Sequence, residues 1–188
     1  MEIVFVRHGV PDYALADERK MSQLEKDYAP LRRDYIRDIK VLASDLVFNG
    51  STVIVSSPYT RALQTAEILN RQFQLDLFIE HDLREWQADV SGGYIDLEER
   101  DRRWFEYRAH LKQGTVPEDV RYEQHEQLRT RTLRVLGQYL GYKKVIVVSH
   151  FNVLESLLGF QEKGIGSGQY QYFSYERAIA GCSRRERS

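Results

Sequence analysis

The chain has 188 residues, a length that suits one domain with a sizeable hydrophobic core. Apolar residues make up 42% and charged residues 29% of the sequence, which is an ordinary composition for a globular protein. The formal net charge of −1 lacks the basic excess that nucleic-acid or acidic-membrane binding usually needs, so we expect neither partner.

The compartment is predicted from the cysteine content and the first residues. The sequence has one cysteine, Cys182, which has no partner for an internal disulfide and is expected to be a surface or packing thiol. An acidic Glu2 and an apolar run of only four residues, 3–6, do not match a signal peptide. No stretch approaches the length of a membrane span, and a cytoplasmic protein is therefore expected.

Short apolar runs that end in polar residues predict the strands. Three strong runs lie at 3–6, 52–55 and 145–148, and a weaker one lies at 75–79. Such runs are apolar on both faces and are typical of central strands covered by helices on each side. Residues 170–175 alternate in character, which predicts an edge strand.

Helical periodicity predicts helices between these runs, at 35–46, 60–73, 98–111, 122–140 and 153–158. Alternating strands and helices predict an α/β fold, a three-layer sandwich with a mostly parallel central sheet and helices on both faces. No linker divides the chain, so we expect a single domain over 1–188. Two polar, aromatic and charged stretches, 12–30 and 89–119, are expected to be insertions or caps.

Four polar residues follow the predicted strands. Arg7 and His8 come directly after the first strand, Arg61 lies in the first turn of the helix after the second, and His150 follows the third strong strand. Ligands of open α/β sheets bind beyond the carboxyl ends of the strands. The sequence therefore predicts that two arginines and two histidines meet at one edge.

This set of side chains suits a phosphate dianion. Arginine binds phosphate oxygens with a planar fork, and a neutral imidazole is a competent nucleophile near pH 7. Attack on phosphorus would give a covalent phosphohistidine, with the arginines stabilising the charge on the phosphoryl oxygens. No metal or cofactor is needed for such a step.

The leaving alkoxide would need a proton from a carboxyl group. The segment 82–86 follows the fourth strand, and its carboxylates can reach the same edge. A carboxyl beside Trp86 and a bound dianion would have a raised pKa and could act first as acid and then as base. Asp82, Glu85 and Asp89 are the candidates.

Four motifs in order resemble the histidine phosphatase superfamily, also called phosphoglycerate mutase-like. They are RHG at 7–9, SPYTRALQTA at 57–66, LRE at 83–85 and VVSH at 147–150. The resemblance covers 3–160 and implies the phosphoglycerate mutase-like fold and phosphatase activity. It also implies that His8 is the nucleophile, that Glu85 is the proton donor, and that phosphate is bound by Arg7, Arg61 and His150.

Departures from the family pattern leave the substrate open. Residues 10–13 lack the asparagine common after the first motif, and Phe151 follows His150 where the family often has glycine or aspartate. The absence of that aspartate favours Glu85 as donor. A small-molecule phosphate ester or a phosphoprotein is the expected partner.

We expect a metal-independent phosphomonoester hydrolase, and two alternatives remain. A phosphoglycerate mutase-like phosphotransferase is disfavoured because such mutases are usually longer and have ligands that are missing here. A catalytically inactive phosphate-binding protein would not need to keep both His8 and Glu85.

Three further features are assigned structural roles. The Arg-Arg-Trp cluster at 102–104 suits a plain amphipathic helix better than a lid over the site. The glycine-rich stretch 164–168 lacks the residues of a phosphate loop and is expected to be a turn. His81, His110 and His125 show no metal-ligand spacing and are expected to be solvated or structural.

Overall fold

The computed structural model describes residues 1–118 and 120–176, apart from the side chains of residues 23 and 24, and Cys182 lies outside this part. Its sheet has the strand order β3-β2-β4-β1-β5. The strands are β1 (Glu2–Arg7), β2 (Val53–Ser56), β3 (Asp76–Ile79), β4 (Lys144–Ser149) and β5 (Tyr170–Ser174). The first four are mutually parallel and β5 pairs antiparallel with β1, so the predicted mostly parallel sheet is confirmed.

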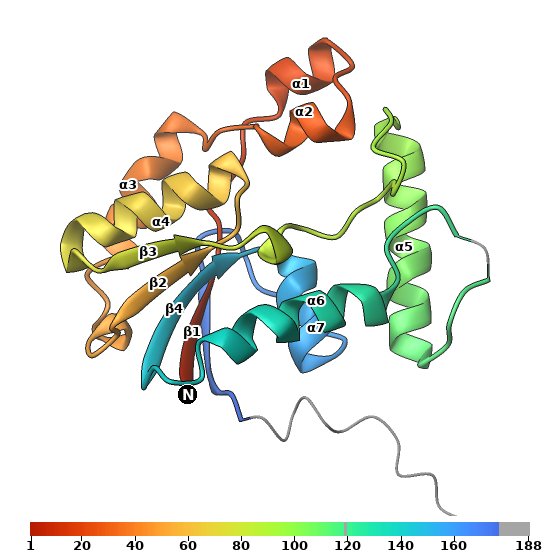
Figure 1. Ribbon diagram of the computed structural model, residues 1–188. Coiled ribbons are helices and arrows are strands. Elements are labelled where there is room, and N and C mark those ends of the chain that lie inside the picture. Colours follow the sequence, from red (N-terminus) through yellow and green to blue (C-terminus); the bar gives the residue numbers. More distant parts are fainter. Residues whose placement is uncertain (119, 177–188) are drawn as a thin grey trace, which may run out of the picture.

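Helices cover both faces of this sheet (Figure 1). They are α1 (Ala14–Glu18), α2 (Gln23–Asp27), α3 (Ile36–Leu42), α4 (Thr60–Phe73), α5 (Leu97–Gln113), α6 (His125–Gln138) and α7 (Phe151–Leu158). Short 3-10 turns lie at Arg33–Tyr35, Leu46–Phe48 and His81–Leu83. Within the described part of the chain, no helix combines the length and the hydropathy needed to cross a bilayer.

Side chains alternate between the two faces of the sheet along each strand, and each face contributes to a separate hydrophobic core. Val4, Val6 and Ile54 pack with α3 and α4, whereas Ile3 and Phe5 point to the opposite face and pack with α6 and α7. Because both faces are covered, these strands are apolar throughout. The three-layer sandwich is thus confirmed.

Strand β3 differs from the three strong strands. It lies at the edge of the sheet, and Phe78 and Ile79 are 42% and 58% exposed. The expectation that its run is covered on both faces is therefore wrong. An edge strand has a neighbour on one side only. Leu77 still packs against the core beneath α3 and α4, whereas the Phe78 ring lies beside Tyr139 and stays partly exposed.

Two predicted helices are too long at one end. The segment 35–46 ends its α-helix at Leu42, and the Asp45 carboxylate then accepts a hydrogen bond from the Val47 N–H and starts a new turn. The helix predicted from residue 122 begins only at His125, where Gln124 forms a capping box. Residues 122 and 123 lie outside the helix because they serve packing and ion pairing, described below.

The predicted insertions lie beyond the carboxyl ends of the strands (Figure 1). Residues 12–30 contain α1 and α2, and an antiparallel bridge between Pro11 and Leu31 closes their base. Residues 89–119 contain the whole of α5. Both insertions are therefore placed where they can form the walls of a site at this edge of the sheet.

The edge also contains a switch in the direction of the chain. Strands β1 and β4 are neighbours, but the chain leaves β1 for α3 on one face and leaves β4 for α7 on the other. Such a switch point opens a crevice between the two strand ends. His8 and His150 are the residues that follow these two strands.

Candidate active site

The backbone fixes the tautomer of His8. Its imidazole Nδ1 lies 2.6 Å from the carbonyl oxygen of Gly9, and a carbonyl can only accept, so Nδ1 carries the proton. The other nitrogen, Nε2, accepts a hydrogen bond from Arg61 Nε at 3.3 Å. His8 is only 4% exposed and presents an unprotonated Nε2 beside a guanidinium.

Gly9 is closely packed by neighbouring side chains. A Cβ atom at this position would lie 2.9 Å from Leu31 Cδ2 and 3.2 Å from Tyr35 Cδ1. Its N–H donates to the Thr65 hydroxyl at 3.1 Å, and that hydroxyl donates to the Arg61 carbonyl at 2.8 Å. The first motif and α4 are thereby fixed to each other.

Arg61 is held by aromatic rings and retains a free donor. Its guanidinium lies over the rings of Tyr59 and Tyr13, at 4.8 and 5.7 Å from their centroids. Arg61 Nη1 is buried and has no hydrogen-bond partner among the residues that the structure describes. A buried donor of this kind is costly unless it serves a ligand.

Arg7 is arranged in a similar way. One of its terminal nitrogens donates to the carbonyl of Ile165 at 2.7 Å, and its guanidinium lies 5.6 Å from the Phe151 ring centroid. Its Nε is buried without a hydrogen-bond partner in the described chain. The predicted turn at 164–168 thus orients an arginine, a role that its sequence did not indicate.

His150 completes the cluster. Its Nε2 lies 2.7 Å from the Ser57 hydroxyl oxygen, and its ring centroid is 4.9 Å from that of His8. His150 is fully buried, and within the described residues its Nδ1 has no partner. The structure therefore brings the two histidines and Arg61 together.

Burial keeps both imidazoles neutral. Desolvation lowers the pKa of His8 well below its usual value and the positive charge of Arg61 lowers it further, while the Gly9 carbonyl opposes both effects. Desolvation and then Arg61 also lower the pKa of His150. Near pH 7 the His8 Nε2 lone pair is consequently available.

Glu85 lies in the segment after β3. Burial raises the pKa of its carboxyl, against hydrogen bonding by the Trp86 N–H and the charges of Arg61 and Arg7. The Trp86 N–H lies 2.8 Å from Glu85 Oε1. Glu85 therefore combines a raised pKa with proximity to both arginines.

A cavity of about 310 Å³ opens over these groups. Arg7, Arg61 and Glu85 are among the residues that line it. The remaining lining residues are Tyr13, Asp17, Lys26, Asp27, Trp86, Ala88, Arg100, Asp101, Trp104, Phe151 and Asn152. His8 and His150 do not line the cavity, and His8 lies behind it in hydrogen-bond contact with the lining residue Arg61.

Comparison with known proteins agrees with this geometry. The profile of the histidine phosphatase superfamily (branch 1) matches residues 3–179. The chain belongs to this superfamily. The prediction of a phosphatase with this fold is confirmed at the level of the family.

Individual relatives of this histidine phosphatase are distant. The uncharacterized phosphatase PhoE of Bacillus subtilis is 28% identical over 162 residues, covering 83% of this chain and 75% of its own. A mycobacterial glucosyl-3-phosphoglycerate phosphatase in complex with VO3 superposes with a TM-score of 0.71 at 18% identity, over 95% of this chain and 93% of that one. Bacillus stearothermophilus YhfR gives a TM-score of 0.63 at 21% identity, over 84% and 77%. The solved structures support the fold.

The other candidate donors of this histidine phosphatase are paired elsewhere. Burial raises the pKa of Asp82, but hydrogen bonds from Arg134 and Arg84 outweigh it and the pKa is lowered. A hydrogen bond from Ser91 lowers the pKa of Asp89 despite its burial, and Arg103 lowers it further. Neither carboxyl lines the cavity. The geometry favours Glu85 among the three candidates.

The sequence did not indicate several residues of the site. Tyr13, Tyr59 and Phe151 stack on the arginines, and Trp104 lines the cavity. The interpretation of 102–104 as part of a plain amphipathic helix is thus incomplete, since α5 also forms a wall of the site. The sequence offered two signals. Phe151 stands directly after His150 where the family often has glycine or aspartate, and a lid over the site was the less favoured interpretation of the 102–104 cluster.

Proposed function

We propose that the protein is a metal-independent phosphomonoesterase that works through a phosphohistidine on His8. The central support is the unprotonated Nε2 of His8 in contact with Arg61. Arg61 Nη1 and Arg7 Nε add buried donors without partners among the described residues, and these suit the oxygens of a phosphate dianion. The arginines would supply the positive charge that the transferring phosphoryl group requires.

The first step forms one bond and breaks another. His8 Nε2 donates its lone pair to phosphorus while the bond from phosphorus to the ester oxygen breaks. The leaving oxygen takes the proton of Glu85, giving the free alcohol and a Glu85 carboxylate. The proton stays on Nδ1, and its hydrogen bond to the Gly9 carbonyl stabilises the positive charge of the phosphorylated ring.

The second step returns the enzyme to its starting state. The Glu85 carboxylate takes a proton from water as the water oxygen attacks phosphorus. The bond from phosphorus to Nε2 breaks, inorganic phosphate is released, and Glu85 is protonated again. The raised pKa of Glu85 suits both roles, because an acid and base near the working pH exchanges protons readily.

We propose a small organic phosphate ester as substrate in preference to a phosphoprotein. The cavity of about 310 Å³ is bounded by residues of α1, α2 and α5, which surround the alcohol portion of a bound ester. Both basic and acidic side chains line this outer part, so a polar alcohol fits better than a purely apolar one.

Release of inorganic phosphate from p-nitrophenyl phosphate tests this proposal. His8→Ala should lower the rate by at least roughly 10⁴-fold, as removal of a covalent nucleophile does elsewhere. His110→Ala is a matched control, because His110 lies near the end of α5 and bonds Thr115 outside the cavity. Full activity of His8→Ala would contradict the proposal, and phosphate transfer without release would favour the mutase alternative.

A further inference from the structure

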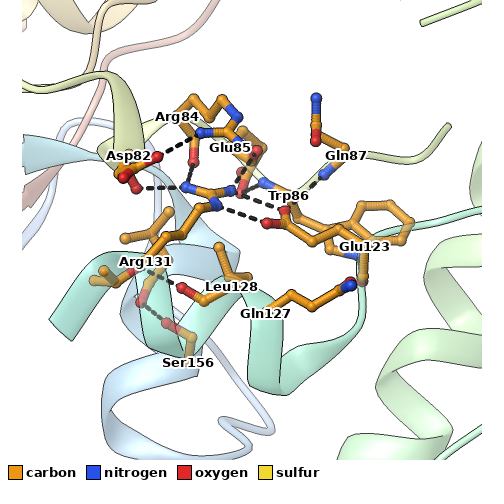
Figure 2. Close-up of polar contacts among 12 residues, drawn as sticks. Asp82, Arg84, Glu85, Trp86, Gln87, Glu123, Gln127, Leu128, Arg131 and Ser156 are labelled. Atoms are coloured by element: carbon orange, nitrogen blue, oxygen red, sulfur yellow. Dashed lines mark hydrogen bonds and ion pairs between the residues drawn. The ribbon is translucent and has the colours of Figure 1, made fainter. Parts of the chain in front are cut away.

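A buried ion pair lies against the segment that carries Glu85 (Figure 2). Arg131 of α6 and Glu123 just before this helix each have a side-chain exposure of 6%. The Arg131 Nε and Nη2 atoms lie 2.6 and 2.8 Å from the two Glu123 carboxylate oxygens. This fork-to-fork geometry fixes the plane of the guanidinium.

The remaining donors of Arg131 bind the main chain around Glu85. Nη1 donates to the carbonyls of Asp82 and Arg84, the latter at 2.7 Å, and Nη2 donates to the carbonyl of Glu85 at 3.0 Å. Together with the ion pair, these bonds use all five N–H donors of the guanidinium. A lysine could not reproduce this set, because its donors share one atom.

Glu123 holds the same segment from its other end. Its Oε2 accepts a hydrogen bond from the Gln87 N–H at 3.2 Å, and its main-chain carbonyl accepts one from Trp86 Nε1 at 2.7 Å. Arg131 and Glu123 therefore bind the segment on both sides of Glu85, as Figure 2 shows.

The segment needs such support because it has little regular structure. After the 3-10 turn His81–Leu83, residues 84–88 form neither helix nor strand. Without strand partners, the direction of the Glu85 side chain depends on the contacts of its neighbours. One of these, the Ser149 hydroxyl, donates to the Leu83 carbonyl at 2.7 Å and connects the segment to β4.

We propose that Arg131 and Glu123 are positioning residues that hold the main chain at Glu85 so that its carboxyl meets the leaving oxygen. The proposal rests on the donor role of Glu85 given above. Neither side chain lines the cavity, so the effect is transmitted through the backbone. A shift of about 1 Å in a reacting group can cost roughly 10²-fold in rate, so a small relaxation of this segment would be measurable.

The test compares two substrates in the full chain carrying Arg131→Lys. An alkyl phosphate needs a proton on its leaving oxygen, whereas p-nitrophenolate leaves without one. We expect kcat/KM to fall by roughly 10–100-fold for the alkyl phosphate and by less than about threefold for p-nitrophenyl phosphate. The ratio of the two values does not depend on the fraction of folded enzyme, so partial unfolding does not obscure it.

Two further variants sharpen the test. In a Glu85→Gln background, Arg131→Lys should change the substrate ratio by less than about twofold, because the group that it positions no longer carries the proton. If Arg131→Lys does not fold, Arg131→Met combined with Glu123→Gln removes both charges of the pair together, and the same ratio is measured.

Arg129→Lys is the matched control. Arg129 lies on the same helix and also donates to main-chain carbonyls, those of Ser156 and Leu157, but these belong to α7. The ratio of kcat/KM for the two substrates in Arg129→Lys should equal that of the wild type. As a second control, inhibition of Arg131→Lys by inorganic phosphate should be unchanged.

Three outcomes would overturn the inference. The first is an equal loss for both substrates in Arg131→Lys, which indicates general support of the fold. The second is the same ratio change in Arg129→Lys. The third is a Glu85→Gln enzyme that shows no preference for the better leaving group, and only this outcome also removes the donor role in the proposed function.

Discussion

His8 depends on its neighbours for both of its chemical properties. The Gly9 carbonyl accepts a hydrogen bond from the Nδ1–H group, which leaves Nε2 unprotonated as the proposed attacking atom. Burial and the charge of Arg61 then keep the ring neutral. The same arginine lies within hydrogen-bond distance of Nε2, where it can move its donors to an incoming phosphate. In the proposed mechanism, Arg61 thereby both prepares the nucleophile and binds the phosphate that His8 attacks.

Replacement of Glu85 by Gln tests the proposed donor. The amide keeps the shape of the side chain and removes the transferable proton. Hydrolysis of an alkyl phosphate should slow by roughly 10²–10⁴-fold, the usual range for a lost general acid. The loss of the first chemical step should be much smaller for p-nitrophenyl phosphate, measured as the burst of p-nitrophenol in a stopped-flow experiment. Equal losses for both esters would make Glu85 a structural residue.

The sequence predicted the phosphate-binding groups and missed their supports. Arg7 ends β1 and His150 follows β4 directly, so the parallel sheet dictates that they share an edge. Phe151 and Tyr59 stack on arginines through loop and helix-start geometry, which has no fixed spacing in the sequence. The role of the Ile165 carbonyl is a main-chain property that its residue type does not reveal.

At the scale of elements, the role of α5 as a wall of the cavity was predicted least well from the sequence. Its residue Arg103 donates to Glu99 at 2.6 Å, to Asp89 at 2.9 Å and to the Ala88 carbonyl at 2.8 Å. These bonds join the helix to the end of the segment that carries Glu85. The neighbouring Arg102 points to solvent and pairs with Glu99 and Glu106 on its own helix.

Removal of Arg103 should therefore destabilise the protein. Arg103→Met leaves the buried Asp89 carboxylate with only its bonds from Ser91, and we expect a loss of about 3 kcal/mol in the free energy of unfolding. Urea denaturation followed by circular dichroism measures this loss. Arg102→Met should leave the urea concentration at the midpoint of unfolding almost unchanged. Equal shifts for the two variants would contradict the assigned anchoring role.

Elements with strong local signals were predicted best. Helix α4 spans Thr60–Phe73, as its apolar spacing indicated. The start of α6 was predicted three residues early, because Tyr122 and Glu123 suit a helix locally but are recruited into the packing around Trp86. Such long-range contacts override local propensity and cannot be read from the neighbouring residues.

At the scale of the whole molecule, the site combines the geometry of the sheet with walls that the insertions supply. The crevice between β1 and β4 places the two histidines, and α1, α2 and α5 lie beyond it (Figure 1). The prediction of a single domain over 1–188 stays a prediction. We expect substrate specificity to be set by these outer walls, whose residue types carry no motif that names a ligand.

The buried site predicts the pH dependence of kcat/KM. The rate should rise as pH increases through the lowered pKa of His8, since only the neutral ring attacks. It should fall as pH increases further through the raised pKa of Glu85, since only the protonated carboxyl donates. The profile for an alkyl phosphate is therefore expected to be bell-shaped with its optimum below pH 7. Glu85→Gln should remove the fall in rate on the alkaline side of the optimum. If that fall is unchanged, a group other than Glu85 causes it.

Trapping the covalent intermediate tests the central claim most directly. The Glu85→Gln enzyme is mixed with ³²P-labelled p-nitrophenyl phosphate and quenched in base, because this variant should form the phosphoenzyme and hydrolyse it slowly. We predict label on His8 that is stable in base, is lost in acid, and is absent from Glu85→Gln combined with His8→Ala. Two results would contradict the account. One is turnover by the wild type with no label on the Glu85→Gln enzyme, and the other is label that persists when His8 is replaced.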